Sequence, residues 1–243
     1  MDTNKPIIIG HRGAAGEAPE NTLGSFRLAA EQGAHAVELD AHLSADGRLM
    51  VCHDATLDRT TDRSGWIGRM QAYEIREADA GVRFSEAYAG EKVPFLDEVF
   101  ELLPAGMMIN VEVKHAYGGK LAPVLLELLR RTDRLGSTVV SSFDHKLLAA
   151  IKKAEPAVRI GLLYAADLVD HAAYAASLGV DVYSLHPQHM LIGPDDTAEA
   201  RRRGLEVYPY TANGEEELNR LIASGVSGII TDYPARLAAL LAR

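Results

Sequence analysis

The chain has 243 residues, of which 47% are hydrophobic and 24% charged, and its formal net charge is −9 at pH 7. This length and composition are typical of a globular protein with a sizeable core, as one large α/β domain or two small ones. The acidic balance argues against a general nucleic-acid binder, which needs a basic face, and the lone Cys52 excludes an intrachain disulfide.

The first residues and the apolar runs bear on where the protein works. Residues 1–5 lack the basic stretch and the long apolar run of a signal peptide. No apolar run approaches the ~20 residues that a membrane-spanning helix needs. We therefore expect a cytoplasmic protein without a membrane span.

Short β-branched runs alternate along the chain with segments of helical periodicity. Strands are predicted at residues 6–10, 36–42, 107–114, 138–143, 159–164, 181–186, 205–211 and 228–232. Helices are predicted at residues 22–32, 96–103, 120–131, 145–154, 170–177, 196–203, 215–223 and 234–241. Eight strands alternating with helices are typical of a (β/α)8 TIM barrel. We favour the barrel over an open doubly wound sheet, which usually has fewer strands.

The segment at residues 44–94, after the second predicted strand, does not fit this alternation. Asp46-Gly47 is a strong hairpin turn, so residues 49–53 are predicted to return as a strand against the second one. The remainder is interpreted as a small insertion over one end of the barrel. Because no linker rich in Gly, Pro and Ser divides the chain, residues 1–243 are expected to form a single domain.

Acidic residues follow a period of two in two of the predicted strands. Glu38 and Asp40 alternate with apolar residues in VELDAHL, and Glu112 and Lys114 do so in NVEVK. Residues two apart in a strand point the same way, and buried charges are costly unless they bind something or each other. One interpretation is a buried cluster of salt bridges. The other is an oxygen-rich site for Mg²⁺ or Ca²⁺ on Glu38, Asp40 and Glu112, where the lack of Cys ligands disfavours zinc.

Two histidines and an arginine stand where such a site needs them. His11 ends the first predicted strand and His53 ends the hairpin strand, although Asp54 could also make His53 a purely local structural pair. Two imidazoles at the catalytic face of a barrel can act as general base and general acid near neutral pH. Arg12, flanked by glycines, can bind an oxyanion through two N–H groups, so the ensemble suits phosphoryl transfer.

Four segments resemble, in the same order, the motif series of the glycerophosphodiester phosphodiesterase family: GHRGAAGEAPENT, VELDAHLSADGRLMVCHDATLDRTT, NVEVK and GIITDYP. The resemblance extends from Gly10 to Pro234. The chain is similar to the bacterial cytoplasmic branch of the family, which also has a compact insertion. It implies a metal-dependent barrel hydrolase that cuts small glycerophosphodiesters into sn-glycerol 3-phosphate and an alcohol. The family's functional positions fall on catalytic His11 and His53, substrate-binding Arg12 and Lys114, and the metal ligands Glu38, Asp40 and Glu112. Mg²⁺ or Ca²⁺ is the implied cation, with Mn²⁺ as a further candidate.

The departures from the family pattern concern the rim of the site. Tyr210 stands where many relatives have a tryptophan, so it is expected to line the mouth on the alcohol side of the substrate. In HPQH, His186 is a candidate substrate contact in a loop after the sixth strand. Asn21 and Asp232 are further residues that could reach the site.

Other functions remain as alternatives at this point. A sugar-phosphate isomerase or aldolase on the same barrel would need no group of three carboxylates. A lysophospholipase D-type phosphodiesterase would favour exposed apolar residues in the insertion, and a non-catalytic phosphodiester-binding protein would not need both histidines. The sequence leaves open the native metal, the head group, the roles of the two histidines, the attacking hydroxyl (water or the glycerol 2-hydroxyl) and the oligomeric state.

Overall fold

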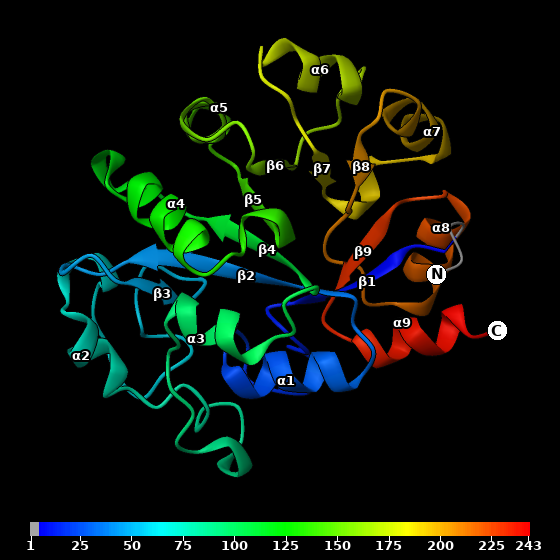
Figure 1. Cartoon of the computed structure of the whole chain (residues 1–243). Coiled ribbons are helices and arrows are strands. Elements are labelled where there is room, and N and C mark those ends of the chain that lie inside the picture. The colour runs from blue at the N-terminus through cyan, green and yellow to red at the C-terminus, as the bar shows by residue number, and fades with distance from the viewer. Residues whose placement is uncertain (1–4) are drawn as a thin grey trace.

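The computed structural model describes residues 5–243, and in them eight parallel strands form a barrel (Figure 1). The strands are β1 (Ile7–His11), β2 (Ala36–Leu43), β4 (Met108–Val113), β5 (Thr138–Ser142), β6 (Arg159–Tyr164), β7 (Ser184–Pro187), β8 (Glu206–Val207) and β9 (Gly228–Thr231). Their order is β8-β7-β6-β5-β4-β2-β1-β9. The barrel closes where Ser227 N donates to Val207 O and Ile230 N to Pro209 O, each at 3.0 Å. The predicted (β/α)8 fold is confirmed.

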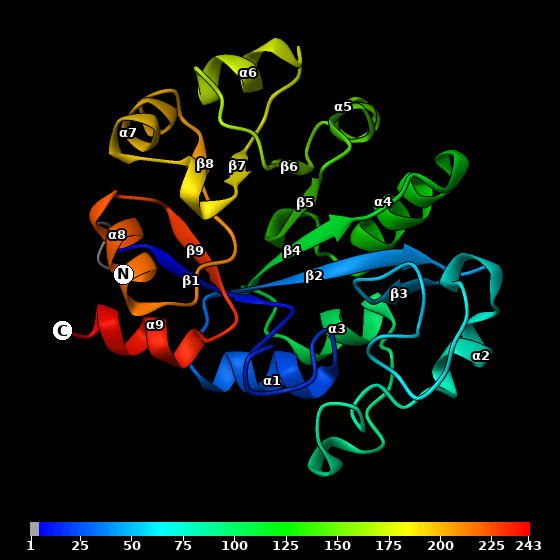
Figure 2. The same ribbon diagram turned by 180° about the vertical axis from the view of Figure 1, so that it is seen from behind.

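Helices surround the strands, as the views from both sides show (Figures 1 and 2). They are α1 (Leu23–Glu31), α3 (Leu96–Leu102), α4 (Leu121–Arg131), α5 (His145–Ala154), α6 (His171–Ser177), α7 (Pro194–Arg202), α8 (Glu215–Ala223) and α9 (Pro234–Leu241). Local residues determine where several helices begin. Thr22 and Asp144 cap α1 and α5 through their side chains, and α9 begins on a proline. The predicted helix bounds therefore agree with the structure to within two residues. No helix among residues 5–243 has the length and apolarity to cross a membrane.

The seventh predicted strand, at residues 205–211, is much shorter than expected. β8 contains only Glu206 and Val207 and pairs with β7 at two positions. On the β7 side, Tyr208 N and Tyr210 N still donate to Leu185 O and Pro187 O, at 2.8 and 3.0 Å, but Pro187 has no N–H to donate in return, so the regular ladder is interrupted there. Pairing resumes as an isolated bridge between Gln188 and Tyr210.

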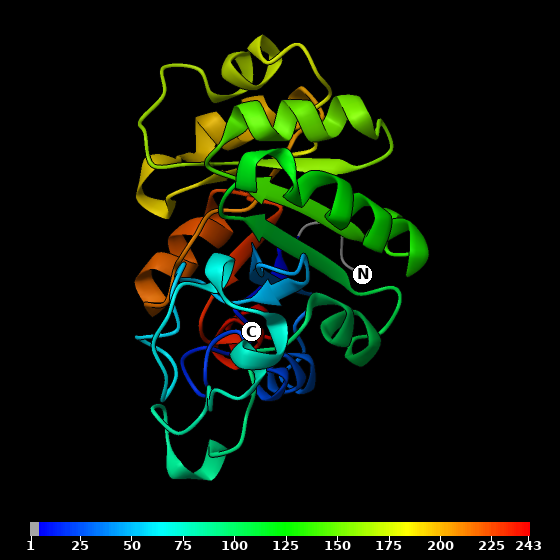
Figure 3. The ribbon, with the colours of Figure 1, turned by 90° about the vertical axis from the view of Figure 1, so that its left-hand side faces the viewer.

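The insertion between β2 and α3 contains the predicted hairpin. β3 (Leu49–Val51) pairs antiparallel with β2 and ends two residues before the predicted end. A short helix, α2 (Ala72–Arg76), was not predicted. The insertion has its own apolar cluster, which includes Met50, Leu57 and Ile75, and it extends to one side of the barrel (Figure 3). A small core of this kind holds the segment as ordered structure against the barrel.

Alternation along the strands separates charged from apolar side chains. Glu38 pairs in register with His11 of β1, and Asp40 with Glu112 of β4, so these side chains share the interior face. Between them, Leu39 and Val111 face the helices and are fully buried. Each such aliphatic burial stabilises the fold by roughly 1.5–3 kcal/mol. The packing of these apolar side chains against the helices thus fixes the charged side chains on the opposite, interior face of the barrel.

His186 is fully buried in β7, so its expected place in a loop after the sixth strand is wrong. Its Nε2 lies 2.8 Å from Ser184 Oγ, and burial lowers its pKa to about 3. A Cβ added at Gly161 would lie 2.4 Å from the same Nε2, so a glycine is required opposite the ring. The structure therefore holds His186 neutral inside the barrel.

We expect His186 to make the fold sensitive to acid. Unfolding raises its pKa toward the ordinary 6.5, so between about pH 3 and pH 6.5 the unfolded chain binds more protons. Stability from this residue is full above about pH 6.5 and falls as pH decreases. Between about pH 7 and pH 5, wild type should lose about 2 kcal/mol more free energy of unfolding than His186→Gln, measured by urea denaturation. His35→Gln is the control, and an equal loss in wild type and His186→Gln would contradict the prediction.

Candidate active site

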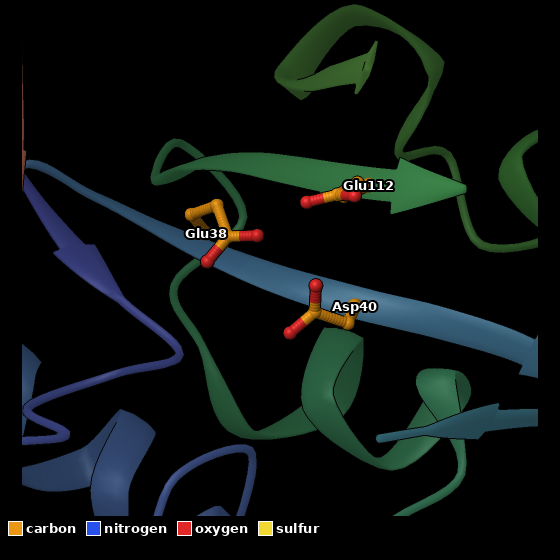
Figure 4. A group of neighbouring side chains, drawn as sticks. All are labelled: Glu38, Asp40 and Glu112. Carbon is orange, nitrogen blue, oxygen red and sulfur yellow. The ribbon is translucent and has the colours of Figure 1, made fainter. Parts of the chain in front are cut away.

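Three carboxylates converge in the barrel interior toward the C-terminal ends of two neighbouring strands. Glu38 and Asp40 come from β2 and Glu112 from β4, and their side chains point into the same space (Figure 4). One oxygen of each lies within 4.8 Å of one oxygen of each of the others. All three residues are buried, with exposed fractions of 4%, 1% and 8%. We call this group the carboxylate cluster.

The two glutamates of the cluster lack full charge compensation. Burial, together with the neighbouring carboxylates, raises the pKa of Glu38 well above its ordinary value and that of Glu112 to about 7. Asp40 behaves differently: burial raises its pKa, but Lys114 and Arg12 together hold that pKa well below its ordinary value. Within residues 5–243, Glu38 has no lysine or arginine side chain at ion-pair distance.

This donor set fits a hard divalent cation. It offers only oxygen ligands. Burial and mutual repulsion raise the pKa values of the two glutamates, and a bound cation would offset both effects. The alternative of a salt-bridge cluster is realised in part, because Lys114 Nζ lies 2.9 Å from Asp40 and 2.6 Å from Glu112. Those contacts leave Glu38 uncompensated, so the carboxylate cluster retains an excess of negative charge.

His11 ends β1 beside the carboxylate cluster. Its Nδ1 lies 2.6 Å from Asp232 Oδ1, and its Nε2 lies 4.0 Å from Glu38 Oε2. Burial raises the pKa of Asp232, but the hydrogen bonds from His11 and Asn213 and the charges of His11 and Arg12 together lower that pKa below its ordinary value. Asn213 Nδ2 donates to the other oxygen of Asp232 at 2.6 Å. An ionised Asp232 therefore places the Nδ1 proton of His11 and leaves Nε2 available on the side of the cluster.

His53 is held by a second carboxylate, in the insertion. Its Nδ1 lies 2.7 Å from Asp54 Oδ1, and Cys52 N donates to Asp40 O at 3.0 Å, which anchors this segment to β2. Burial lowers the pKa of His53 below its ordinary value, with Asp40 as the largest opposing influence. A neutral imidazole with its Nδ1 engaged has Nε2 free to accept a proton.

Two cations lie against the carboxylate cluster. The backbone N–H of Arg12 donates to Glu38 at 3.0 Å, and its guanidinium lies 3.3 Å from Asp40 and 2.8 Å from Glu20. Lys114 contacts Asp40 and Glu112, as given above. The site thus combines an acidic centre with a basic margin, which is the charge pattern expected for binding a phosphoryl group beside a cation.

The glycines that flank His11 and Arg12 are required by the turn after β1. A Cβ at Gly10 would lie 2.5 Å from Gly13 O. Gly13 has a φ of 90°, and a Cβ there would lie 2.3 Å from Ser25 Oγ. The turn can therefore present His11 and Arg12 to the cluster only with glycine at both places.

Tyr210 lies on the other side of the barrel mouth from β2, among aromatic neighbours. Its hydroxyl donates to Tyr164 O at 3.2 Å, and its ring meets Phe143 edge to face at 6.1 Å between centroids. It makes no hydrogen bond to the carboxylate cluster within the part of the chain that the structure describes. Phe143 is 54% exposed, so this side of the mouth is apolar where the other is charged.

Several polar neighbours of the site were weakly indicated or missed by the sequence. Asn21 is buried and donates to Asp40 at 2.7 Å, and Asp232 holds His11, so both loosely expected residues do reach the site. Asn213 and the ion pair of Glu20 with Arg12 were not predicted. The position of Asp232 directly after an interior strand was the signal for it, whereas Glu20 lies in a loop without periodicity.

Comparison with known proteins decides the family. The model of the Glycerophosphoryl diester phosphodiesterase family matches residues 11–236. The chain belongs to this family. A glycerophosphodiester phosphodiesterase of Caldanaerobacter subterraneus is 38% identical over 237 residues, covering 96% of each chain. One of Bacillus subtilis is 31% identical and covers 96% of this chain and 86% of its own.

Solved structures of the family agree over nearly the whole enzyme. A phosphodiesterase of Oleispira antarctica in complex with the product sn-glycerol-3-phosphate has a TM-score of 0.90 at 30% identity and 98% coverage of both chains. The enzyme of Agrobacterium tumefaciens has a TM-score of 0.83 at 32% identity, over 96% of this chain and 99% of its own. As a member of the family, the enzyme hydrolyses glycerophosphodiesters, and the isomerase, aldolase and non-catalytic alternatives lose their support.

Proposed function

We propose that the enzyme releases sn-glycerol 3-phosphate from small glycerophosphodiesters by acid–base catalysis at the carboxylate cluster. The observation that carries this proposal is the pairing of two imidazoles with two carboxylates beside that cluster. His11 is held by Asp232 at 2.6 Å and His53 by Asp54 at 2.7 Å. A site that only bound phosphodiesters would need neither imidazole.

Each residue has a defined part in the proposed reaction. When bound at the carboxylate cluster, a divalent cation would neutralise charge on the phosphoryl oxygens and favour ionisation of the attacking hydroxyl. Arg12 and Lys114 bind the remaining phosphoryl charge. One histidine accepts the proton of the attacking hydroxyl, which belongs to water or to the glycerol 2-hydroxyl. The other donates a proton to the oxygen that leaves with the alcohol, so that one P–O bond forms and one breaks.

Divalent-cation dependence is a property of the family, and the carboxylate cluster can hold such an ion. We propose Mg²⁺ or Ca²⁺ as the native ion, because three carboxylates and no thiolate suit hard cations, with Mn²⁺ as a further candidate. We further propose that Tyr210 contacts the alcohol side of the substrate, that residues 1–243 act as one domain with the insertion at 44–94, and that the enzyme is cytoplasmic.

Release of glycerol 3-phosphate from metal-stripped enzyme tests the reaction and its cation together. Glycerophosphocholine and glycerophosphoethanolamine are supplied before and after addition of Mg²⁺, Ca²⁺ or Mn²⁺. We expect no turnover in the stripped enzyme and recovery with at least one cation, because the carboxylate cluster alone repels an anionic substrate. Full turnover in the stripped enzyme would contradict the cation requirement.

A second candidate is a lysophospholipase D-type preference for substrates with an acyl chain. The exposed Phe143 beside Tyr210, and the 56% exposed Trp66 of the insertion, favour it. The same assay therefore includes lysophosphatidylcholine. Turnover confined to that substrate would replace the proposed small substrates with lipid ones.

A further inference from the structure

Arg59, in the insertion, binds two carboxylates at once. Its Nε and one terminal nitrogen donate to the two oxygens of Asp54 at 2.8 and 3.1 Å. Its terminal nitrogens also donate to the two oxygens of Glu20 at 2.8 and 2.7 Å. All three guanidinium nitrogens are therefore used, in two bidentate pairs. Glu20 lies 39 residues earlier in the chain, between β1 and α1.

Each of these carboxylates holds a group of the proposed site. Asp54 accepts from His53 Nδ1 at 2.7 Å, and Glu20 accepts from Arg12 at 2.8 Å. Arg59 is thus the central member of a continuous chain of contacts from His53 through Asp54 and Glu20 to Arg12. The planar guanidinium fixes the separation and the relative tilt of the two carboxylates, which a flexible ammonium cannot do.

We propose that Arg59 is a positioning residue for the hydrolysis: it sets the place of His53 relative to Arg12, and so the place of the proton-transfer group relative to the phosphoryl group. The inference rests on the roles proposed above for His53 and Arg12. Within residues 5–243, the side chain of Arg59 makes no hydrogen bond or ion pair with the carboxylate cluster. Its side chain is 47% exposed, so its ion pairs add little to the stability of the fold.

The chain provides a matched control in the same segment. Arg63 pairs with Glu77 at 2.7 Å, within the insertion, and its side chain is 49% exposed. Its partner holds no residue of the proposed site. Arg63→Met therefore removes an arginine ion pair of similar exposure without disturbing the chain of contacts from His53 to Arg12.

Kinetics of Arg59→Met with glycerophosphocholine and saturating cation give the main test. A displacement of about 1 Å between catalytic groups costs about 100-fold, so we expect kcat to fall by about 10- to 100-fold, more than KM changes. Arg59→Lys should recover only a small part of kcat, because an ammonium cannot bind both carboxylates bidentately. Arg63→Met should stay within about twofold of wild type, and each variant should keep its Tm within roughly 2–4 °C.

A double-mutant cycle shows whether the effect passes through Asp54. If it does, Asp54→Asn combined with Arg59→Met is hardly slower than the slower single variant, because both break the same contact. Wild-type kcat in Arg59→Met, an equal loss in Arg63→Met, or fully additive losses in the cycle would each overturn the proposal.

Imidazole NMR signals of the metal-free protein test the position of His53 without turnover. We expect the His53 signals to shift in Arg59→Met and not in Arg63→Met, and unchanged signals would overturn the proposal. If Arg59→Met shifts the His53 signals but the wild-type enzyme hydrolyses no glycerophosphodiester with any cation, the proposed function is refuted while Arg59 still positions His53.

Discussion

His11→Ala and His53→Ala should each lower the turnover of glycerophosphocholine by about 10²–10⁴-fold, the usual contribution of one positioned proton-transfer group. The effect should fall on kcat, because each imidazole acts on a proton that moves only in the transition state. The two side chains are partly buried at the rim, with exposed fractions of 18% and 33%, so their removal leaves the core intact. Steady-state kinetics at saturating cation, with Tm as the check on folding, measure the loss.

His35→Ala serves as the control for the two histidine variants. His35 precedes β2 at the opposite end of the barrel, where its Nδ1 accepts from Ile8 N at 3.0 Å. Its replacement should leave kcat unchanged within about twofold, since surface changes away from a site rarely reach it. Full activity in both His11→Ala and His53→Ala would show that neither imidazole transfers the proton.

Asp40→Asn should weaken cation binding by about 10²- to 4 × 10³-fold, the equivalent of the roughly 3–5 kcal/mol that breaking a buried charged pair costs. Asp40 is the least exposed residue of the carboxylate cluster, at 1%, and it is the one that both Lys114 and Arg12 contact. Without its charge, those two cations face the incoming ion with less compensation. Titration of metal-free protein with Mn²⁺, followed by electron paramagnetic resonance, measures the affinity directly.

Asp97→Asn controls for a general loss of negative charge. Asp97 lies on α3 and pairs with Arg48 at 3.3 Å, away from the carboxylate cluster. The Asp97→Asn variant should bind Mn²⁺ as wild type does, because salt screens the interaction between a charge on α3 and a cation at the carboxylate cluster. A wild-type affinity in Asp40→Asn, or the same weakening in both variants, would refute the assignment of the cation to the cluster.

Strand periodicity made the carboxylate cluster predictable. Glu38 and Asp40 stand two residues apart on a buried strand, and Glu112 does the same with Lys114, so parity alone placed them on one face. The pairing of β2 with β4 then brings Asp40 opposite Glu112. The parallel βα pattern was sufficient to predict that these residues would lie near one end of a barrel.

Contacts between distant loops could not be predicted in this way. Glu20 meets Arg59 across 39 residues, and neither residue lies in a periodic element. The partner of His11 is 221 residues away, so the sequence indicated that Asp232 ended a strand but not which imidazole it would hold. Contacts between irregular segments depend on the complete fold. The length of β8 was overestimated because Pro187 on the neighbouring strand and Pro209 within the run each remove a backbone donor.

The backbone pairing between neighbouring strands is less complete on one side of the barrel than on the other. β2 pairs with β4 at six positions beneath the carboxylate cluster, whereas β8 pairs with β7 at two, and Pro187 and Pro209 each remove one backbone donor around the segment that leads to Tyr210. Segments with fewer backbone hydrogen bonds open locally at lower free energy. If Tyr210 contacts the alcohol as proposed, we expect the wall next to it to adjust to alcohols of different size while the groups proposed to bind the phosphoryl group stay in place. Substitutions there can change the leaving group that the enzyme accepts without a matching change in its chemistry.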